Sequence, residues 1–158
     1  KPGMDSMKES DEIEGVIIQP LRQIIDNRGA ILHMMRNDTK LYEKFGEIYF
    51  SEILTGKVKA WKMQTEKTQN LAVPVNKIRL VIYDSRSKSK THGKIKEYEI
   101  GRPDNYNLIR IPPMLWYGFQ SLDGQTSLIS NCANYPHNPD EIESLPYNSD
   151  QIPYRWKP

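Results

Sequence analysis

Short apolar runs separated by turn-forming clusters extend through this chain, and this pattern limits its possible folds more than any other feature. Clusters such as Asp26-Asn27-Arg28-Gly29 and Asp123-Gly124 interrupt the runs, because these residue types favour tight turns. The runs are rich in Val, Ile, Tyr and Trp, which favour strands. They lie at 15–20, 30–35, 47–54, 57–64, 71–83, 95–100, 108–111 and 127–131. Many short strands at this spacing predict an all-β sandwich or barrel.

Three segments depart from the strand pattern. Residues 39–45 are expected to form a short helix, with Asp38 or Thr39 as its N-cap. Residues 136–158 hold five of the eleven prolines, which predicts a C-terminal arm that is either ordered and extended over the surface or loose. Residues 1–13 are interpreted as a tag remnant with a disordered N-terminus, which leaves 14–158 as a single domain.

The charges of the chain nearly cancel, because 22 Lys and Arg residues stand against 20 Asp and Glu residues, for a net charge of +2. This balance argues against nucleic acid and membrane surfaces as partners. No run approaches the 18 apolar residues of a membrane-spanning helix. Cys132 is the single cysteine, so no intrachain disulfide can form, and a reducing, cytoplasmic location is expected.

Familiar motifs for metals, cofactors and nucleophiles are missing from the sequence. It has no glycine-rich phosphate loop, no HExxH, no CxxC and no G-x-S-x-G. The histidines are His33, His92 and His137, and no two of them lie two residues apart on one strand. Neither a metal site nor any other cofactor is therefore predicted. His33 lies in an expected strand, where it is a candidate for contact with a ligand.

Alternating side chains predict a polar interior for the barrel. In the run 57–64, Val58 and Ala60 share one face with Lys62 and Gln64, and the two apolar residues suggest that this face points inward. By the same alternation Asp84 and Ser130 would also point inward. Because buried charges need partners, Lys62 and Asp84 are expected close together. The alternative is the opposite strand phase, which would place Lys62 in solvent.

Seven motifs in order resemble the dTDP-4-dehydrorhamnose 3,5-epimerase family. The family's G-V-L-R-G-L-H-Y-Q is matched at 56–64 by GKVKAWKMQ, and its V-A-V-D-x-R at 81–86 by VIYDSR. Its I-P-E-G-F-A-H-G-F is matched at 111–119 by IPPMLWYGF. The other matches are DNRG at 26–29, THG at 91–93, NY at 134–135 and WKP at 156–158. The resemblance implies an all-β, cupin-type jelly-roll β-barrel and a homodimer.

The departures from the family's motifs fall on its catalytic positions. The family removes protons next to the 4-keto group of a nucleotide-bound 6-deoxyhexose, which requires a base, an acid and donors near the keto oxygen. At the matching positions Lys62 replaces the family's histidine base, Ser130 its tyrosine acid and Asn148 the aspartate that orients the base. Tyr117 replaces a second histidine, and Lys59 an arginine. The standard double epimerisation is therefore not expected.

The positions that the resemblance assigns to substrate binding are better kept. Arg28 matches a residue expected near the nucleotide, and Tyr135 one expected to stack on the base. His33 stands where the family has an acidic residue, which weakens the argument for thymidine. With Lys59, Gln64 and Asn148 these residues form the expected binding set for a nucleotide-linked sugar, with a dTDP-sugar as the first candidate.

Two functions fit this sequence. The first is a sugar-nucleotide isomerase or epimerase of deoxysugar or surface polysaccharide synthesis, with altered chemistry. In it Lys62 is the base or a cation on the keto oxygen, Tyr117 is the acid, and Asp84 positions Lys62. The second is a non-catalytic relative that binds a sugar nucleotide or glycan or acts as a partner subunit, because all three acid and base positions are substituted.

Overall fold

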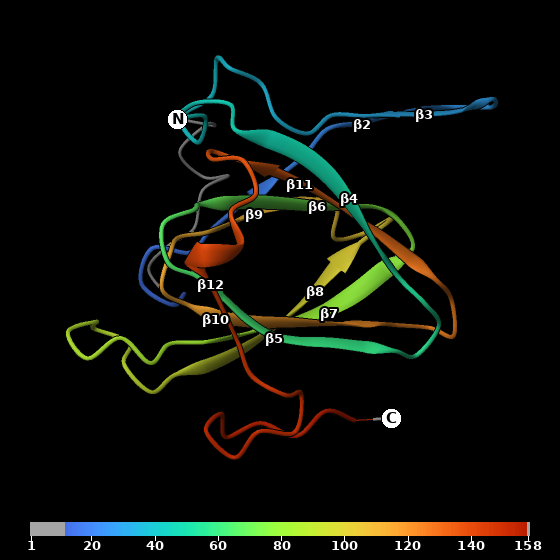
Figure 1. The fold of residues 1–158 in the computed structure, drawn as a ribbon. Coiled ribbons are helices and arrows are strands. Elements are labelled where there is room, and N and C mark those ends of the chain that lie inside the picture. The colour runs from blue at the N-terminus through green and yellow to red at the C-terminus, as the bar shows by residue number, and fades with distance from the viewer. Residues whose placement is uncertain (1–11, 158) are drawn as a thin grey trace.

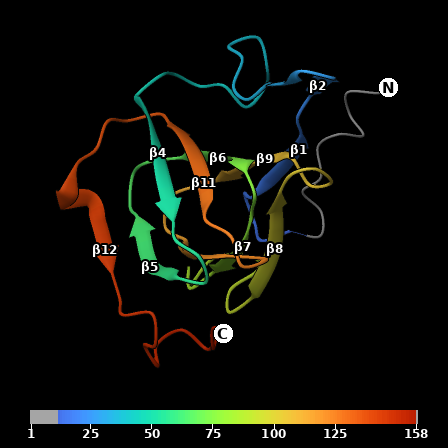
Figure 2. The ribbon, with the colours of Figure 1, turned by 90° about the vertical axis from the view of Figure 1, so that its right-hand side faces the viewer.

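Two five-stranded sheets face each other and form the body of the molecule, as Figures 1 and 2 show. The structure is a computed structural model that describes residues 12–157. The first sheet has the order β1 (Ile17–Pro20), β9 (Asn107–Ile111), β6 (Gln69–Val75), β11 (Ser127–Ala133) and β4 (Glu47–Ile53). The second has the order β12 (Ile142–Ser144), β5 (Val58–Gln64), β10 (Trp116–Ser121), β7 (Lys77–Tyr83) and β8 (Ile95–Gly101).

All strand pairs in the two sheets are antiparallel, and the main core lies between the sheets. Side chains from both inner faces meet there, among them Ile53, Leu71, Ile82 and Ile129, each at most 2% exposed. Burying one such side chain contributes about 1.5–3 kcal/mol. The all-β jelly-roll barrel predicted from the sequence is confirmed.

The C-terminal arm is ordered and covers the outer face of the second sheet (Figure 1). Trp61 exchanges two backbone hydrogen bonds with Leu145, and its indole packs 5.2 Å from Trp156 and 6.0 Å from Tyr154 between ring centroids. A short 3-10 helix (Pro139–Glu141) begins this arm. The extended arm, one of the two alternatives for the proline-rich tail, is therefore the one the structure shows.

The short helix predicted at 39–45 is wrong. The chain forms turns there, with i to i−3 backbone hydrogen bonds from Thr39 to Arg36 and from Tyr42 to Thr39. Leu41 is 4% exposed and packs with Ile17 of β1 on the outer side of the first sheet. Burial of Leu41 against the sheet therefore outweighs the local preference for a helix.

Other boundaries also differ from the sequence-based expectations. The single run predicted at 71–83 is two strands, because Asn76 between β6 and β7 has a left-handed φ of 58° and its side chain donates to the Thr126 carbonyl at 2.6 Å. Strands β2 (Gln23–Asp26), β10 and β12 were not predicted. The segment set aside as 1–13 lies mostly outside the described residues, but Ile13 is fully buried in the core, so the folded body begins no later than this residue.

Strands β2 and β3 (Gly29–Leu32) pair only with each other and project from the barrel as a hairpin (Figure 1). Three isoleucines on this hairpin, Ile24, Ile25 and Ile31, are 41%, 63% and 62% exposed. Apolar side chains gathered at an exposed site often mark an interaction surface. Among residues 12–157, no helix has the length and apolar character to cross a membrane.

Candidate functional site

A cavity of about 390 Å³ opens between the two sheets. This volume lies within the range of small-molecule sites. The first sheet lines it with Tyr49 and Ser51 of β4, Gln69 and Leu71 of β6, and Ile129 and Asn131 of β11. The second sheet and the start of the C-terminal arm line it with Lys59, Ala60, Trp61 and Lys62 of β5, Tyr117 and Phe119 of β10, and Ser144 and Leu145.

A bulge brings two lysines of β5 to this cavity. Lys62 lies opposite Tyr117 on β10, whereas Lys59 lies opposite Phe119, so three steps along β5 match two steps along β10. The extra residue shifts the alternation of side chains by one position. Lys59, expected on the face opposite to that of Lys62, therefore lines the cavity as well.

Both lysines donate to serine hydroxyls. Lys62 Nζ lies 3.3 Å from Ser144 Oγ, and Lys59 Nζ lies 3.2 Å from Ser51 Oγ. The Lys62 side chain lines the cavity and is also exposed to solvent, so each of the two alternatives drawn from the sequence describes part of its position. Two cations at one opening suit a ligand that carries negative charge.

Tyr117 forms part of the floor of the cavity. Its hydroxyl accepts a hydrogen bond from Gln64 Nε2 at 2.9 Å, and both residues are 5% exposed. Burial, helped by the nearby charges of Tyr49 and Glu141 and opposed by hydrogen bonds from Gln64 and Gln69, raises the pKa of Tyr117 to about 12. The phenol therefore stays protonated through neutral and mildly alkaline pH.

A second set of polar side chains on the first sheet escaped the sequence analysis. Asn131 Nδ2 donates to the Tyr49 hydroxyl and to Gln69 Oε1, each at 2.8 Å. Burial raises the pKa of the Tyr49 phenol, although the hydrogen bond from Asn131 opposes this. The pattern of β4 concealed Tyr49, because the apolar Ile48 and Phe50 suggest the inward face and yet are 52% and 62% exposed.

Two buried amide oxygens next to the cavity receive no hydrogen bond from the described residues. They are Gln64 Oε1 and Asn131 Oδ1, on side chains that are 5% and 2% exposed. A buried acceptor without a donor costs about 1–3 kcal/mol. A hydroxyl group of a ligand in the cavity would supply the donor for Asn131, which belongs to the cavity lining, whereas Gln64 does not.

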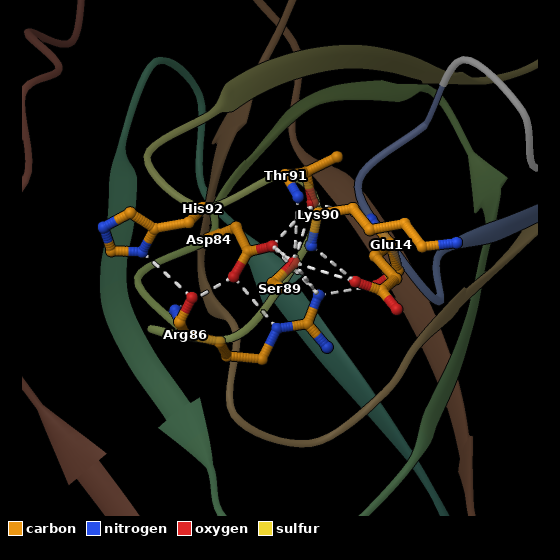
Figure 3. A network of polar contacts seen from close by, with 7 residues as sticks. All are labelled: Glu14, Asp84, Arg86, Ser89, Lys90, Thr91 and His92. Carbon is orange, nitrogen blue, oxygen red and sulfur yellow. Dashed lines mark hydrogen bonds and ion pairs between the residues drawn. The ribbon is translucent and has the colours of Figure 1, made fainter.

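Asp84 does not line the cavity, and its described hydrogen bonds are not with Lys62. Figure 3 shows its carboxylate accepting hydrogen bonds from Arg86 Nε at 2.9 Å and from Arg86 Nη2 at 3.0 Å. The Ser89 and Thr91 hydroxyls donate to the same carboxylate at 2.5 and 2.6 Å. The predicted contact between Asp84 and Lys62 is therefore wrong, because Asp84 follows the end of β7 and holds the loop that leads to β8.

Ser130 also lies outside the cavity. Its neighbours Ile129 and Asn131 line the cavity, so alternation along β11 turns Ser130 toward the other face of the sheet. There its hydroxyl contacts the sulfur of Met34 at 3.1 Å. The prediction that Ser130 lines the interior is wrong, because the strand alternates one residue out of step with the expectation. Asn131 is the residue that points inward.

The residues expected to bind substrate are dispersed on this chain. Arg28, at the tip of the projecting hairpin, pairs with Asp26 at 2.6 Å, and its side chain is 84% exposed. Tyr135 is 41% exposed, with Lys44 Nζ 3.9 Å from the centre of its ring. Asn148 is exposed in a turn of the C-terminal arm. Of the expected binding set, Lys59 lines the cavity directly and Gln64 lies behind Tyr117.

His33 lies outside the cavity as well. Its carbonyl accepts a hydrogen bond from the Tyr106 hydroxyl at 2.8 Å. With Arg22 and Arg36 it lines a separate depression of about 290 Å³.

Comparisons with known proteins agree with the fold. A family model described as dTDP-4-dehydrorhamnose 3,5-epimerase matches residues 10–158. The chain is 36% identical over 152 residues to the probable low-salt glycan biosynthesis epimerase Agl13 of Haloferax volcanii, covering 91% of this chain and 94% of that protein. It is 31% identical over 147 residues to the spore coat polysaccharide biosynthesis protein SpsL of Bacillus subtilis, covering 91% and 96%. The crystal structure of a dTDP sugar isomerase from Desulfovibrio desulfuricans is 46% identical, with a TM-score of 0.89 and coverage of 91% and 92%.

Proposed function

The chain belongs to the dTDP-4-dehydrorhamnose 3,5-epimerase family, and on this premise we propose that it isomerises a nucleotide-linked 4-keto-6-deoxyhexose at a carbon beside the keto group. The observation that carries the proposal is the presence of Lys59 and Lys62 in one cavity between the sheets. A proton beside a keto group can be removed because the resulting enolate places its charge on the keto oxygen. Such chemistry needs a base and a cation at one site.

In this proposal Lys62 is the base. Its amine lies at the cavity and contacts only a serine hydroxyl among the polar groups whose hydrogen bonds are described, so it can turn toward a bound sugar. Lys59 supplies positive charge near the keto oxygen or the diphosphate. The chemistry differs from the standard reaction of the family, because a lysine stands at the position of the histidine base and Asn148 at the position of the aspartate that orients it.

We propose that the nucleotide is bound with the help of a second copy of the chain. The projecting hairpin exposes three isoleucines, and the outer face of β4 exposes Ile48 and Phe50. A homodimer in which the hairpin of one copy packs on the other would cover these side chains. It would also carry Arg28 toward the partner's cavity, where a guanidinium suits a phosphate.

The proposed product is a precursor of a glycan or surface polysaccharide. The names of two relatives, a probable glycan biosynthesis epimerase and a spore coat polysaccharide biosynthesis protein, support this role. We also propose a cytoplasmic location, because the lone, buried Cys132 suits a reducing compartment. A dTDP-sugar is the first candidate substrate.

Hydrogen exchange tests the proposed activity. In D₂O, the protein is expected to introduce deuterium at C3 or C5 of one member of a panel of dTDP-, UDP- and CDP-linked 4-keto-6-deoxyhexoses. Lys62→Ala should reduce the exchange rate by about 10²–10⁴-fold, as expected for loss of a general base. Lys57→Ala is the matched control, because Lys57 is exposed and lies outside the cavity.

Calorimetric titration with the same panel separates the catalytic proposal from the non-catalytic alternative. Binding with no exchange at C3 or C5 in the wild-type protein would refute the isomerase and support a sugar-nucleotide receptor. Exchange that survives in Lys62→Ala at the wild-type rate would refute Lys62 as the base.

A further inference from the structure

Inversion of a carbon requires groups on two sides of the sugar. A base removes the proton from one face of the ring, and an acid must return a proton to the opposite face. Lys62 of β5 and Tyr117 of β10 are register partners on neighbouring strands of the second sheet. Their backbones therefore belong to the same wall of the cavity, which makes them a poor pair for opposite faces.

The opposite wall is formed by the first sheet. Its strands β4, β6 and β11 contribute two apolar side chains, two amides, the hydroxyl of Ser51 and the phenol of Tyr49. The hydroxyl of Ser51 is a far weaker acid than the phenol of Tyr49. The two amides do not release a proton near neutral pH. Within the described lining of this wall, Tyr49 is therefore the group suited to act as an acid.

We propose that Tyr49 is the general acid that delivers the proton opposite Lys62. This inference rests on the proposed function. Tyr49 replaces Tyr117, the acid expected from the sequence, because Tyr117 is 5% exposed and lies on the floor, whereas Tyr49 is 37% exposed at the cavity.

The hydrogen bonds of the first sheet orient the Tyr49 hydroxyl for this task. Asn131 is the register partner of Tyr49 on β11, and its amide nitrogen donates to the Tyr49 oxygen. The same nitrogen donates to Gln69 Oε1, so both of its N–H groups are used and the amide is fixed in orientation. The phenol therefore accepts one hydrogen bond, and its own proton remains available to a ligand.

The proton balance of the step is complete with water as the only further reactant. The carbon–hydrogen proton moves to Lys62 Nζ, and its electron pair passes to the keto oxygen as an enolate. The Tyr49 O–H bond then breaks as its proton bonds to the same carbon on the opposite face, and the keto group re-forms. Tyr49 regains a proton from water, and the Lys62 ammonium releases one.

The ratio of inverted product to exchanged substrate tests this assignment. The assay uses the dTDP-linked 4-keto-6-deoxyhexose that the wild-type protein exchanges in D₂O. Tyr49→Phe should lower this ratio at least about tenfold, because Lys62 still exchanges the proton from its own face but no acid serves the other face. Tyr117→Phe, the matched control, should slow exchange and inversion together and leave the ratio unchanged. An unchanged ratio in Tyr49→Phe, or a lowered ratio in Tyr117→Phe instead, would overturn the assignment.

A fluorinated tyrosine keeps the test informative if Tyr49→Phe fails to fold. Replacement of Tyr49 by 3,5-difluorotyrosine retains its shape and makes the phenol more acidic. The decrease of the inversion rate at alkaline pH should then begin at a lower pH than in the wild-type protein. A decrease that begins at the same pH in both proteins would contradict the proposal. These outcomes differ from failure of the proposed function, in which the wild-type protein exchanges no sugar of the panel.

Discussion

At the scale of single residues, Asp84 illustrates how an apparently catalytic carboxylate can be structural. Burial alone would raise the pKa of Asp84, but hydrogen bonds from Arg86, Ser89 and Thr91 outweigh burial and hold the pKa well below its usual range. A lowered pKa in the folded state stabilises the protein above the pKa of the unfolded chain, about 3.9. This stability should be lost as pH falls from about 4 toward the lower folded pKa.

We therefore predict that Asp84→Asn lowers the free energy of unfolding at pH 7 by about 3 kcal/mol, because it leaves Arg86 without its buried partner. Urea unfolding at pH 7 and pH 3 measures the effect, and the variant should lose less stability between these two pH values than the wild-type protein does. Asp123→Asn is the control, since its carboxylate is 64% exposed and its loss should cost at most about 0.5 kcal/mol. Equal effects of the two substitutions would contradict a structural role for Asp84.

At the scale of elements, the phase of β11 decides which of two adjacent polar residues meets a ligand. Asn131 faces the cavity and Ser130 faces Met34 on the other side of the sheet. We predict that Asn131→Ala weakens binding of a dTDP-sugar about threefold to tenfold, through loss of about one hydrogen bond, whereas Ser130→Ala changes it less than about twofold. Calorimetric titration of the two variants measures this, and the reverse order of effects would refute the strand phase described above.

At the scale of the whole molecule, the projecting hairpin determines the proposed assembly. We predict that the double variant Ile25→Lys and Ile31→Lys converts a dimer into a monomer, because two charges replace exposed apolar side chains of the hairpin. Sedimentation velocity measures the change. Tyr147→Lys is the control, because Tyr147 is 56% exposed on the C-terminal arm. A wild-type protein that sediments as a monomer would refute the dimer.

The strands and their turns were predictable because their signals are local. Alternating apolar residues and clusters such as Asp123-Gly124 report on a few neighbouring residues, and most strands appeared near their predicted places. The helix at 39–45 failed because Leu41 is buried by a sheet that is distant in sequence. The strand β10 was missed although its sequence, WYGFQS, is rich in aromatic residues.

The sequence by itself determined the all-β barrel and the family, since both depend on the order of local motifs along the chain. Only the tertiary structure decided which side chains share the cavity. The bulge between β5 and β10 places Lys59 in the cavity lining together with Lys62. The phase of β11 places Asn131, and not Ser130, in this lining. Asp84, which was expected at the site, lies outside the cavity and pairs with Arg86, whereas Tyr49 of the edge strand β4 lines the cavity. The physical reason is that side chains alternate with a period of two, so a shift of one residue, set by pairing with a distant strand, turns a side chain to the other face of a sheet.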